Sequence, residues 1–461
     1  MIPFRPVTPA DRARFEHYTH AGKRQNCDLA FANIYCWKGL YRSELAEVEG
    51  DLVIRFRIDG GEQIGYMFPL GEGDLPRVIE VLRSDAASFG QPLRLMGLEW
   101  EDCCALKQLY GGAFAVDRRR SMSDYIYRRE DLCRLSGKHF QPKRNHLNRF
   151  RTHYPNHRFE PLTPDRFTEC LRLEQTWCQN NDRCREAAIV AEREAMQCAF
   201  DHFEELGLRG GCLYVEDRLV AFTYGSTVNH NTFVIHVEKA DTHIEGAFAM
   251  INHAFAQSLD EQIEWINREE DLGIEGLRKA KLSYNPTHLV DKYSAVALSE
   301  EGLACRRLWE EAFPTDEERF LDRFLVRYFR PERMLTCRDE QGIIAMAHLI
   351  PFATERGMVG YLYGVATASA ARGQGLASEL IERAATEAHR AGCVAVVLIP
   401  GSESLHTFYA ARGFSGHFPL QLTTPDYFDF GTGSPDSDWG MWRSLDGSSA
   451  PAEALQATYI D

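Results

Sequence analysis

Long apolar runs are missing from this chain of 461 residues. Its most continuous ones, such as VAVVLI at 394–399, fall far short of the roughly 20 residues that a transmembrane helix needs. The opening MIPFRPVTPADRARF also has no apolar core of the kind that a signal peptide contains. We therefore expect a cytoplasmic protein without transmembrane insertion.

Paired cysteine motifs are missing too. The 13 cysteines are scattered, with no C-x-x-C pair, which predicts reduced and mostly buried thiols. Two histidine pairs, His17 with His20 and His153 with His157, have no nearby acidic or thiol partner, so we expect no metal site. Acidic residues outnumber basic ones, and the net charge of −15 disfavours non-specific binding of the protein surface to a polyanion.

Lysine is missing from the last part of the chain, because Lys292 is the final one. This shift in composition near residue 297 indicates a domain boundary. Hairpin patterns recur at 51–70, 211–227 and 333–352, each with a Gly-containing or acidic turn, and each is followed by helix and strand patterns. We predict an α+β protein of three similar units, 1–130, 131–297 and 298–461, with mixed, mostly antiparallel sheets flanked by helices.

The stretch ARGQGLASEL, residues 371–380, joins a strand pattern to an amphipathic helix that ends near Gly392. A glycine-rich turn before a helix N-terminus presents free backbone N–H groups and a positive dipole end, so it can bind a phosphate. The spacing G-x-G-x-x-S nearly fits a dinucleotide fingerprint, but only one such strand-turn-helix is present. The P-loop pattern G-x-x-x-x-G-K-[ST] is absent.

As R-x-x-G-x-A (Arg372, Gly375, Ala377), the same stretch resembles the pyrophosphate loop of GNAT acyltransferases, and Tyr409 with Gly413 and Phe414 matches their Y-x-x-x-G-F. The resemblance covers about residues 299–420 and implies acetyl-CoA as co-substrate. It implies that CoA contacts the following residues: Val365, Arg372, Gly373, Gln374, Gly375, Leu376, Ala377 and Ser404, which stands where the family often has asparagine.

The same resemblance implies roles in catalysis. Backbone groups around Val365 would polarise the acyl carbonyl, and Tyr409 would protonate the departing sulfur; the alternative for Tyr409 is a core tyrosine. The central strand pattern GMVGYLYGVATAS has no glutamate, the residue that many GNAT enzymes use as base there. Glu403 or His406 could relay a proton instead, or could simply be solvated.

The first 297 residues carry two polar segments. One, 137–154, is basic and aromatic and includes Lys143 and Arg144; it could hold a phosphate backbone or be the solvated face of a helix. The other, 265–293, contributes four further site candidates: Asn267, Arg268, Glu269 and Lys281. Both segments resemble a family related to the C-terminal domain of lysyl-phosphatidylglycerol synthases, which is built as a tandem pair of GNAT-like units.

That resemblance implies aminoacyl transfer from tRNA to an amine or hydroxyl acceptor. Glu238 and Lys239, at the end of a strand, would be acid-base candidates or a structural ion pair. Residues 242–255 (THIEGAFAMINHAF) lack R-x-x-G-x-A, so no CoA pyrophosphate is expected there.

Our leading hypothesis is acetyl-CoA-dependent N-acetylation of a small-molecule or peptide amine by the C-terminal unit. The alternatives are aminoacyl-tRNA-dependent transfer to a lipid or peptide by the N-terminal module, with tRNA as a partner, and a non-catalytic acyl-CoA sensor or scaffold.

Overall fold

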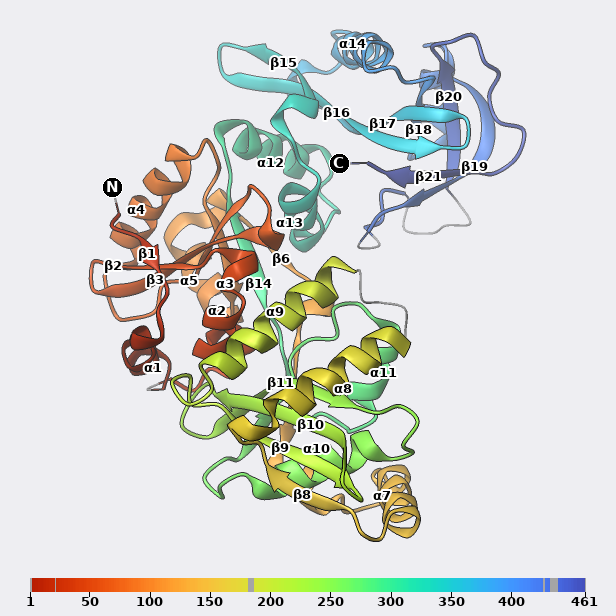
Figure 1. Cartoon of the computed structure of the whole chain (residues 1–461). Coiled ribbons are helices and arrows are strands. Elements are labelled where there is room, and N and C mark those ends of the chain that lie inside the picture. Colours follow the sequence, from red (N-terminus) through yellow and green to blue (C-terminus); the bar gives the residue numbers. More distant parts are fainter. Residues whose placement is uncertain (1, 21, 181–185, 426–427, 432–437, 461) are drawn as a thin grey trace. The chain divides into compact units, whose positions relative to one another are not determined.

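The computed structural model describes residues 2–20, 22–180, 186–425, 428–431 and 438–460. They form two compact units, Met1–Ala297 and Leu298–Asp461 (Figure 1). Three seven-stranded sheets of mixed strand direction are flanked by helices, two sheets in the first unit and one in the second. The predicted α+β class is confirmed.

The first sheet opens the chain. Its strand order is β1 (Arg5–Pro6), β2 (Glu44–Val48), β3 (Asp51–Arg57), β4 (Ile64–Met67), β5 (Arg94–Leu98), β14 (Tyr293–Ala297) and β6 (Phe114–Arg118). Its helices are α1 (Arg12–His20), α2 (Phe31–Cys36), α3 (Lys38–Tyr41), α4 (Leu75–Ser88) and α5 (Trp100–Tyr110). Val78, Ile79 and Leu82 recur at helical spacing on α4 and pack against Tyr66 and Leu95 of the sheet.

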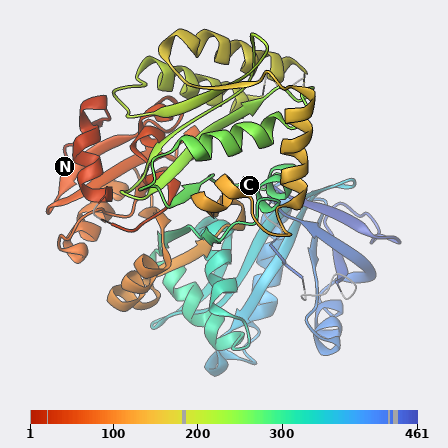
Figure 2. The ribbon, with the colours of Figure 1, turned by 90° about the horizontal axis from the view of Figure 1, so that it is seen from below.

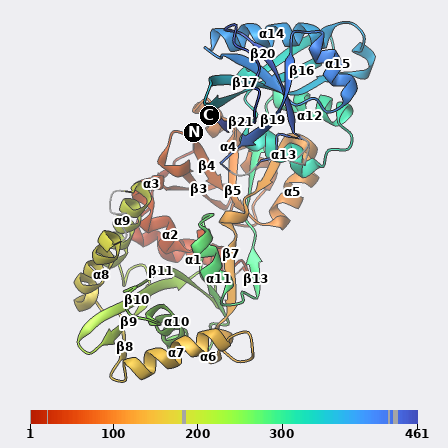
Figure 3. The same ribbon diagram turned by 90° about the vertical axis from the view of Figure 1, so that its right-hand side faces the viewer.

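The second sheet has the order β13 (His288–Val290), β7 (Asp124–Arg128), β12 (Trp265–Asn267), β11 (Thr232–Ala240), β10 (Arg218–Thr227), β9 (Arg209–Val215) and β8 (Arg158–Pro161). Its helices are α6 (Arg129–Arg134), α7 (Gln141–His153), α8 (Phe167–Asn180), α9 (Ala187–Asp201), α10 (Ala247–Ser258) and α11 (Glu275–Leu282). The sheet is a central layer, with α8 and α9 over one face and α10 over the other (Figures 2 and 3).

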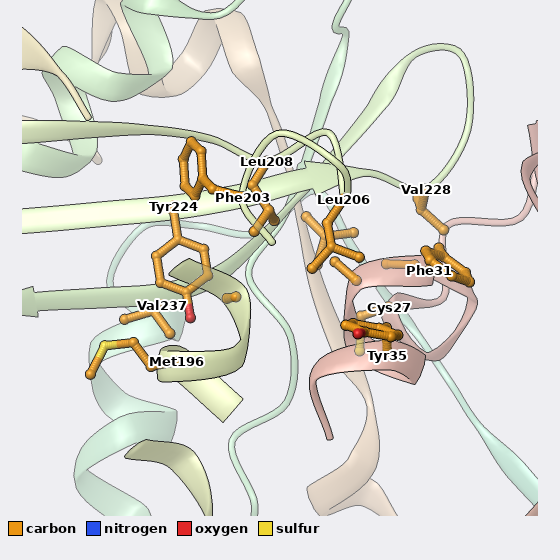
Figure 4. Close-up of a cluster of buried hydrophobic side chains, with 14 of the residues drawn as sticks. Cys27, Phe31, Tyr35, Met196, Phe203, Leu206, Leu208, Tyr224, Val228 and Val237 are labelled. Carbon is orange, nitrogen blue, oxygen red and sulfur yellow. The ribbon is translucent and has the colours of Figure 1, made fainter. Parts of the chain in front are cut away.

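These two sheets exchange strands relative to the predicted segments 1–130 and 131–297. Strand β7 precedes residue 130 but pairs with β12 and β13 of the second sheet. Strand β14 comes after the whole second sheet but lies between β5 and β6 of the first. A shared apolar cluster also joins the two halves, with Phe31 and Tyr35 of α2 near Met196 of α9 and Tyr224 of β10 (Figure 4).

The second unit contains the third sheet and the helices that flank it. Its helices are α12 (Glu300–Ala312), α13 (Glu318–Arg327), α14 (Leu376–Arg390) and α15 (Glu403–Ala410). Its sheet has the order β15 (Met334–Asp339), β16 (Gly342–Thr354), β17 (Gly357–Thr367), β18 (Ala395–Leu398), β20 (Trp439–Ser444), β19 (Ser415–Thr423) and β21 (Leu455–Tyr459). Ser299 is the N-cap residue of α12, and its side chain accepts the Gly302 N–H. Across both units, no described helix is long and apolar enough to cross a bilayer.

Candidate functional sites

A strand-helix-strand unit with a parallel strand pair recurs in all three sheets: β4–α4–β5, β11–α10–β12 and β17–α14–β18. In the second sheet β11 pairs with β12 only over Thr232–Val234, and in the third β17 pairs with β18 only over Val359–Tyr361. The first strand of each pair then continues for six residues, 235–240 and 362–367. The two strands therefore diverge beyond their last paired residues, and we call this region their parting. Backbone N–H and C=O groups of the longer strand border it.

In the second unit, an open helix N-terminus follows the parting strands. Gly375 caps α14 in the left-handed region, with φ +83°, and Gly373 has φ +80°. A Cβ atom at either glycine would have no described heavy atom within 4 Å beyond its chain neighbours. Gly375 O accepts the N–H groups of Ser378 and Glu379, so the N–H groups of the first turn before them point out of the helix. This geometry suits a phosphate.

A bulge in β17 lies before that loop. The pairing with β16 shifts register between Met346 and His348, and Gly364 takes φ +58°. A Cβ atom on Gly364 would lie 2.6 Å from a ring carbon of Trp309, so the bulge needs glycine for both conformation and space. The bulge breaks the ladder next to Val365 and re-aims its backbone groups.

Tyr409 lies on α15 in the apolar cluster that Val365 and Leu376 border. The structure therefore brings these three predicted residues together. Burial raises the pKa of Tyr409 to about 12, so the hydroxyl stays protonated at neutral pH and can act as an acid.

Of the other α15 candidates, Glu403 and Ser404 are exposed and His406 is partly buried. Glu403 is in the first turn of the helix, and the Ser404 hydroxyl lies 3.0 Å from that of the N-cap residue Ser402. Arg372 is exposed as well and donates from Nε to Thr367 O at 3.4 Å, which leaves its terminal nitrogens available.

The corresponding helix N-termini of the first unit are already covered. Asp74 caps α4 through the Arg77 N–H, and Asp51 accepts the Gly73 N–H at 2.7 Å, so carboxylates hold the position of an anion. At α10, a Cβ on the capping Gly246 would lie 2.9 Å from His146 O and 3.1 Å from the Phe150 Cβ, because α7 packs there. Of the three described N-termini, that of α14 has open space at both of its loop glycines.

A buried polar cluster instead occupies the parting of β11 and β12. Glu238, beyond the last β11–β12 pair, accepts from Arg268 Nη2 at 2.8 Å and from Asn252 Nδ2 at 3.1 Å. Only 11% of the Glu238 side chain and 13% of the Arg268 side chain are exposed. Asn252 Oδ1 and Arg268 Nη1 are buried and have no hydrogen-bond partner among the described residues. An acceptor and a donor are thus left available to a ligand.

Lys143 of α7 completes this cluster. Its Nζ lies 3.7 Å from the centre of the Tyr284 ring, which Arg268 also faces at 4.9 Å. Burial and the nearby Arg268 charge lower the pKa of Lys143 to about 8. A lysine with that pKa is partly neutral at physiological pH and can accept a proton.

The remaining candidates in this half support the cluster or lie elsewhere. Lys281 donates to the Arg268 and Glu270 carbonyls, and Asn267 donates to Asp124 and Gln25 O. The Lys281 bonds hold the chain just after β12, and the Asn267 bonds hold the last residue of that strand. Glu269 pairs with His236 at 2.9 Å, and Lys239 pairs with Glu192 of α9. Arg144 donates to Leu135 O and Gly137 O, so it closes a loop away from Glu238.

Sequence reasoning missed one charged site, which lies between the two sheets of the first unit. Lys292 is buried and lies 3.0 Å from Asp124 and 3.5 Å from the Cys27 sulfur, and it contacts Glu270. Ligand atoms of these three partners lie within 4.8 Å of one another, as at a metal site, but the Lys292 ammonium lies among them. The four residues come from distant segments, so no local pattern could indicate the cluster.

Comparisons with known proteins agree with this architecture. Residues 20–296 match the family described as phosphatidylglycerol lysyltransferase, C-terminal, and residues 303–414 match the acetyltransferase (GNAT) family. A conserved protein of unknown function from Bacteroides thetaiotaomicron is 47% identical, covers 65% of this chain and 100% of its own, and has a TM-score of 0.63. L-PGS from Bacillus licheniformis is 16% identical over 65% of this chain and 96% of its own, with a TM-score of 0.47.

A curated relative, an uncharacterised protein of Mycoplasmoides gallisepticum, is 25% identical over 176 residues. The match takes in 38% of this chain and 56% of that relative, so it spans little more than half of the relative's length. The family match covers most of the first unit, and it is followed by the match to the acetyltransferase family. The chain belongs to the phosphatidylglycerol lysyltransferase C-terminal family and carries a GNAT domain after it.

Proposed function

We propose that the second unit is an acetyl-CoA-dependent N-acyltransferase acting on a small-molecule or peptide amine. The observation that carries the proposal is the open N-terminus of α14 at the mouth of the β17–β18 parting. Gly373 and Gly375 leave room for a pyrophosphate, and the first-turn N–H groups with Arg372 supply donors. The match to the GNAT family over residues 303–414 supports the same assignment.

The roles of individual residues follow from their positions. Acetyl-CoA would supply the activated acyl group, and the bulge at Gly364–Val365 would orient its carbonyl by backbone hydrogen bonds. Tyr409, protonated and buried, would give a proton to the departing sulfur. Tyr361 is unsuited as base because its hydroxyl is buried and donates to Phe430 O. Glu403 or His406 remains as the residue that would relay the amine proton to solvent.

Calorimetry with acetyl-CoA tests the binding site. We expect micromolar binding to the full-length protein and loss of binding in the double variant Arg372→Ala, Gly375→Asp. Gly392→Asp is the matched control, because Gly392 lies at the other end of α14, also with positive φ and open space around it. Equal binding by all three proteins would place CoA elsewhere, and no binding by any would reject the proposal.

Replacing Tyr409 with Phe then separates an enzyme from a sensor. An acetyltransferase should lose turnover of an amine acceptor while it keeps its affinity for acetyl-CoA. A sensor or scaffold that only binds acyl-CoA should lose nothing measurable.

We also propose a second activity, aminoacyl transfer by the first unit. The cluster of Glu238, Arg268, Asn252 and Lys143 favours it, since these residues occupy the strand parting in a unit whose helix N-terminus is covered. Unpaired Asn252 Oδ1 could accept from an α-ammonium group and Arg268 Nη1 could donate to an ester carbonyl. The family name points to an aminoacyl donor, for which we propose aminoacyl-tRNA.

Retention of charged tRNA by the full-length protein tests this second activity. We expect the protein to retain aminoacylated tRNA more strongly than uncharged tRNA, and we expect Lys143→Met to slow aminoacyl transfer. Lys138→Met is the control, because Lys138 is exposed in the same segment. Equal retention of charged and uncharged tRNA at low salt would argue against the activity.

A further inference from the structure

Two thiols meet where the halves of the first unit pack together. Cys36 is the last residue of α2, and Cys198 lies on α9, a helix that covers the second sheet. The two helices pack against each other, and both cysteines border the apolar cluster that joins the halves. The side chains of Cys36 and Cys198 interact with each other, and both are only partly buried. They are therefore close together and within reach of a small oxidant.

The surroundings of Cys198 favour its thiolate. The interaction with Cys36 does most to stabilise the anion, burial opposes it, Lys38 and His202 favour it, and Asp201 opposes it. Together they lower the pKa of Cys198 to about 7, while the same pairing raises that of Cys36. The positive groups are held in place, since Lys38 lies 3.6 Å from the Tyr35 ring centre and the Tyr35 hydroxyl lies 3.2 Å from His202 Nε2.

A second thiol pair in the same unit lacks these features. Cys170 and Cys212 also interact with each other, but both are fully buried. Burial and the pairing raise the pKa of Cys170. A buried, protonated thiol is a poor nucleophile, so proximity alone does not make a pair oxidisable.

We propose that Cys36 and Cys198 form a peroxide-sensitive thiol pair that oxidises to a disulfide between α2 and α9. The Cys198 thiolate attacks one oxygen of hydrogen peroxide, the O–O bond breaks, and hydroxide leaves. The Cys36 sulfur then attacks the sulfenic sulfur of Cys198 and releases a second hydroxide, and these two hydroxides end as water. In total, two thiols and one peroxide give one disulfide and two water molecules.

The bond would tie the helix layer of the second sheet to the first sheet. Because α9 also carries Glu192, which pairs with Lys239 next to Glu238, the disulfide would hold α9 beside the polar cluster of the β11–β12 parting. Reduction by a thiol would release it.

Mass spectrometry of the reduced full-length protein after brief exposure to hydrogen peroxide tests the proposal. Free thiols are alkylated in denaturant, and the digest is analysed without reduction. We expect a linked peptide pair containing Cys36 and Cys198, reversible by dithiothreitol, while Cys170 and Cys212 remain alkylated. We also expect Cys198 to oxidise about tenfold faster than the exposed Cys104.

Two variants make the result decisive. In Cys36→Ser the disulfide cannot form, and Cys198 should accumulate as a sulfenic acid that dimedone traps. In Cys198→Ser, Cys36 should stay reduced. Oxidation of Cys170 with Cys212 at the same rate, or a Cys198 that reacts no faster than Cys104, would overturn the proposal.

Discussion

Replacing Glu238 with Gln tests whether the polar cluster at the β11–β12 parting is held by a buried ion pair. Gln has the same shape, but it carries no charge, and its NH2 group must face either the Arg268 or the Asn252 donor. The Arg268 guanidinium would then be buried without its counter-ion. Removing one partner of a buried pair costs about 3–5 kcal/mol.

Hydrogen exchange of the full-length protein measures this cost locally. An opening free energy lower by that amount speeds exchange on the order of 10²- to 10⁴-fold. We expect this acceleration in peptides that cover β11, Thr232–Ala240, if these amides exchange through opening of the parting. Peptides from β18, Ala395–Leu398, lie in the other unit and serve as an internal control.

The double variant Glu238→Leu, Arg268→Met removes both charges at similar volume. We expect it to recover most of the protection, because exchange of a buried pair for apolar side chains is often neutral. Exchange of β11 in Glu238→Gln within about threefold of the parent protein would refute the reasoning, since threefold corresponds to only about 0.7 kcal/mol.

Three further predictions address the other features. If Lys143 acts as a neutral amine, the rate of aminoacyl transfer should rise with pH through about pH 8, and Lys143→Met should remove this rise. The unfolded chain keeps the Lys143 proton up to about pH 10.5, so the free energy of unfolding should also rise with pH between these two values. Gly364→Ala should destabilise the second unit by about 2–4 kcal/mol through left-handed strain and the Trp309 contact, seen as faster exchange of β17. Lys292→Met should leave Asp124 and Glu270 without their cation, costing about 3–5 kcal/mol, and an unchanged melting temperature would contradict this.

Local features of the fold could be predicted from the sequence because each depends on neighbouring residues. The turn at Asp339–Gly342 does separate β15 from β16, and the turn at Glu216–Arg218 lies between β9 and β10. The glycines of the Arg372 loop do precede a helix, Leu376–Arg390, because only glycine enters the left-handed region at low cost. These elements are set by turn chemistry and periodicity.

Long-range pairing could not be predicted in this way. Strand β14 resembles any short apolar strand, and nothing in its sequence shows that it returns to a sheet begun almost 300 residues earlier. Lys292, just before it, is buried against Cys27 and Asp124 because that return brings three distant segments together. Similarly, Lys143 and Arg268 could each be named as candidates, but their shared contact with Tyr284 is a tertiary fact.

The three strand-helix-strand units share one backbone arrangement but differ in whether the N-terminus of the helix is open to an anion. An anion site at a helix N-terminus requires free N–H groups and room for the anion, and the backbone supplies only the first. In the first sheet Asp51 and Asp74 take those donors, and at α10 the packing of α7 removes the room. Side chains and packing, not the fold, therefore leave room for an anion at α14 and not at the other two described helix N-termini. Under the proposed aminoacyl transfer, the charged side chains at the β11–β12 parting would hold the donor substrate in place of a helix N-terminus.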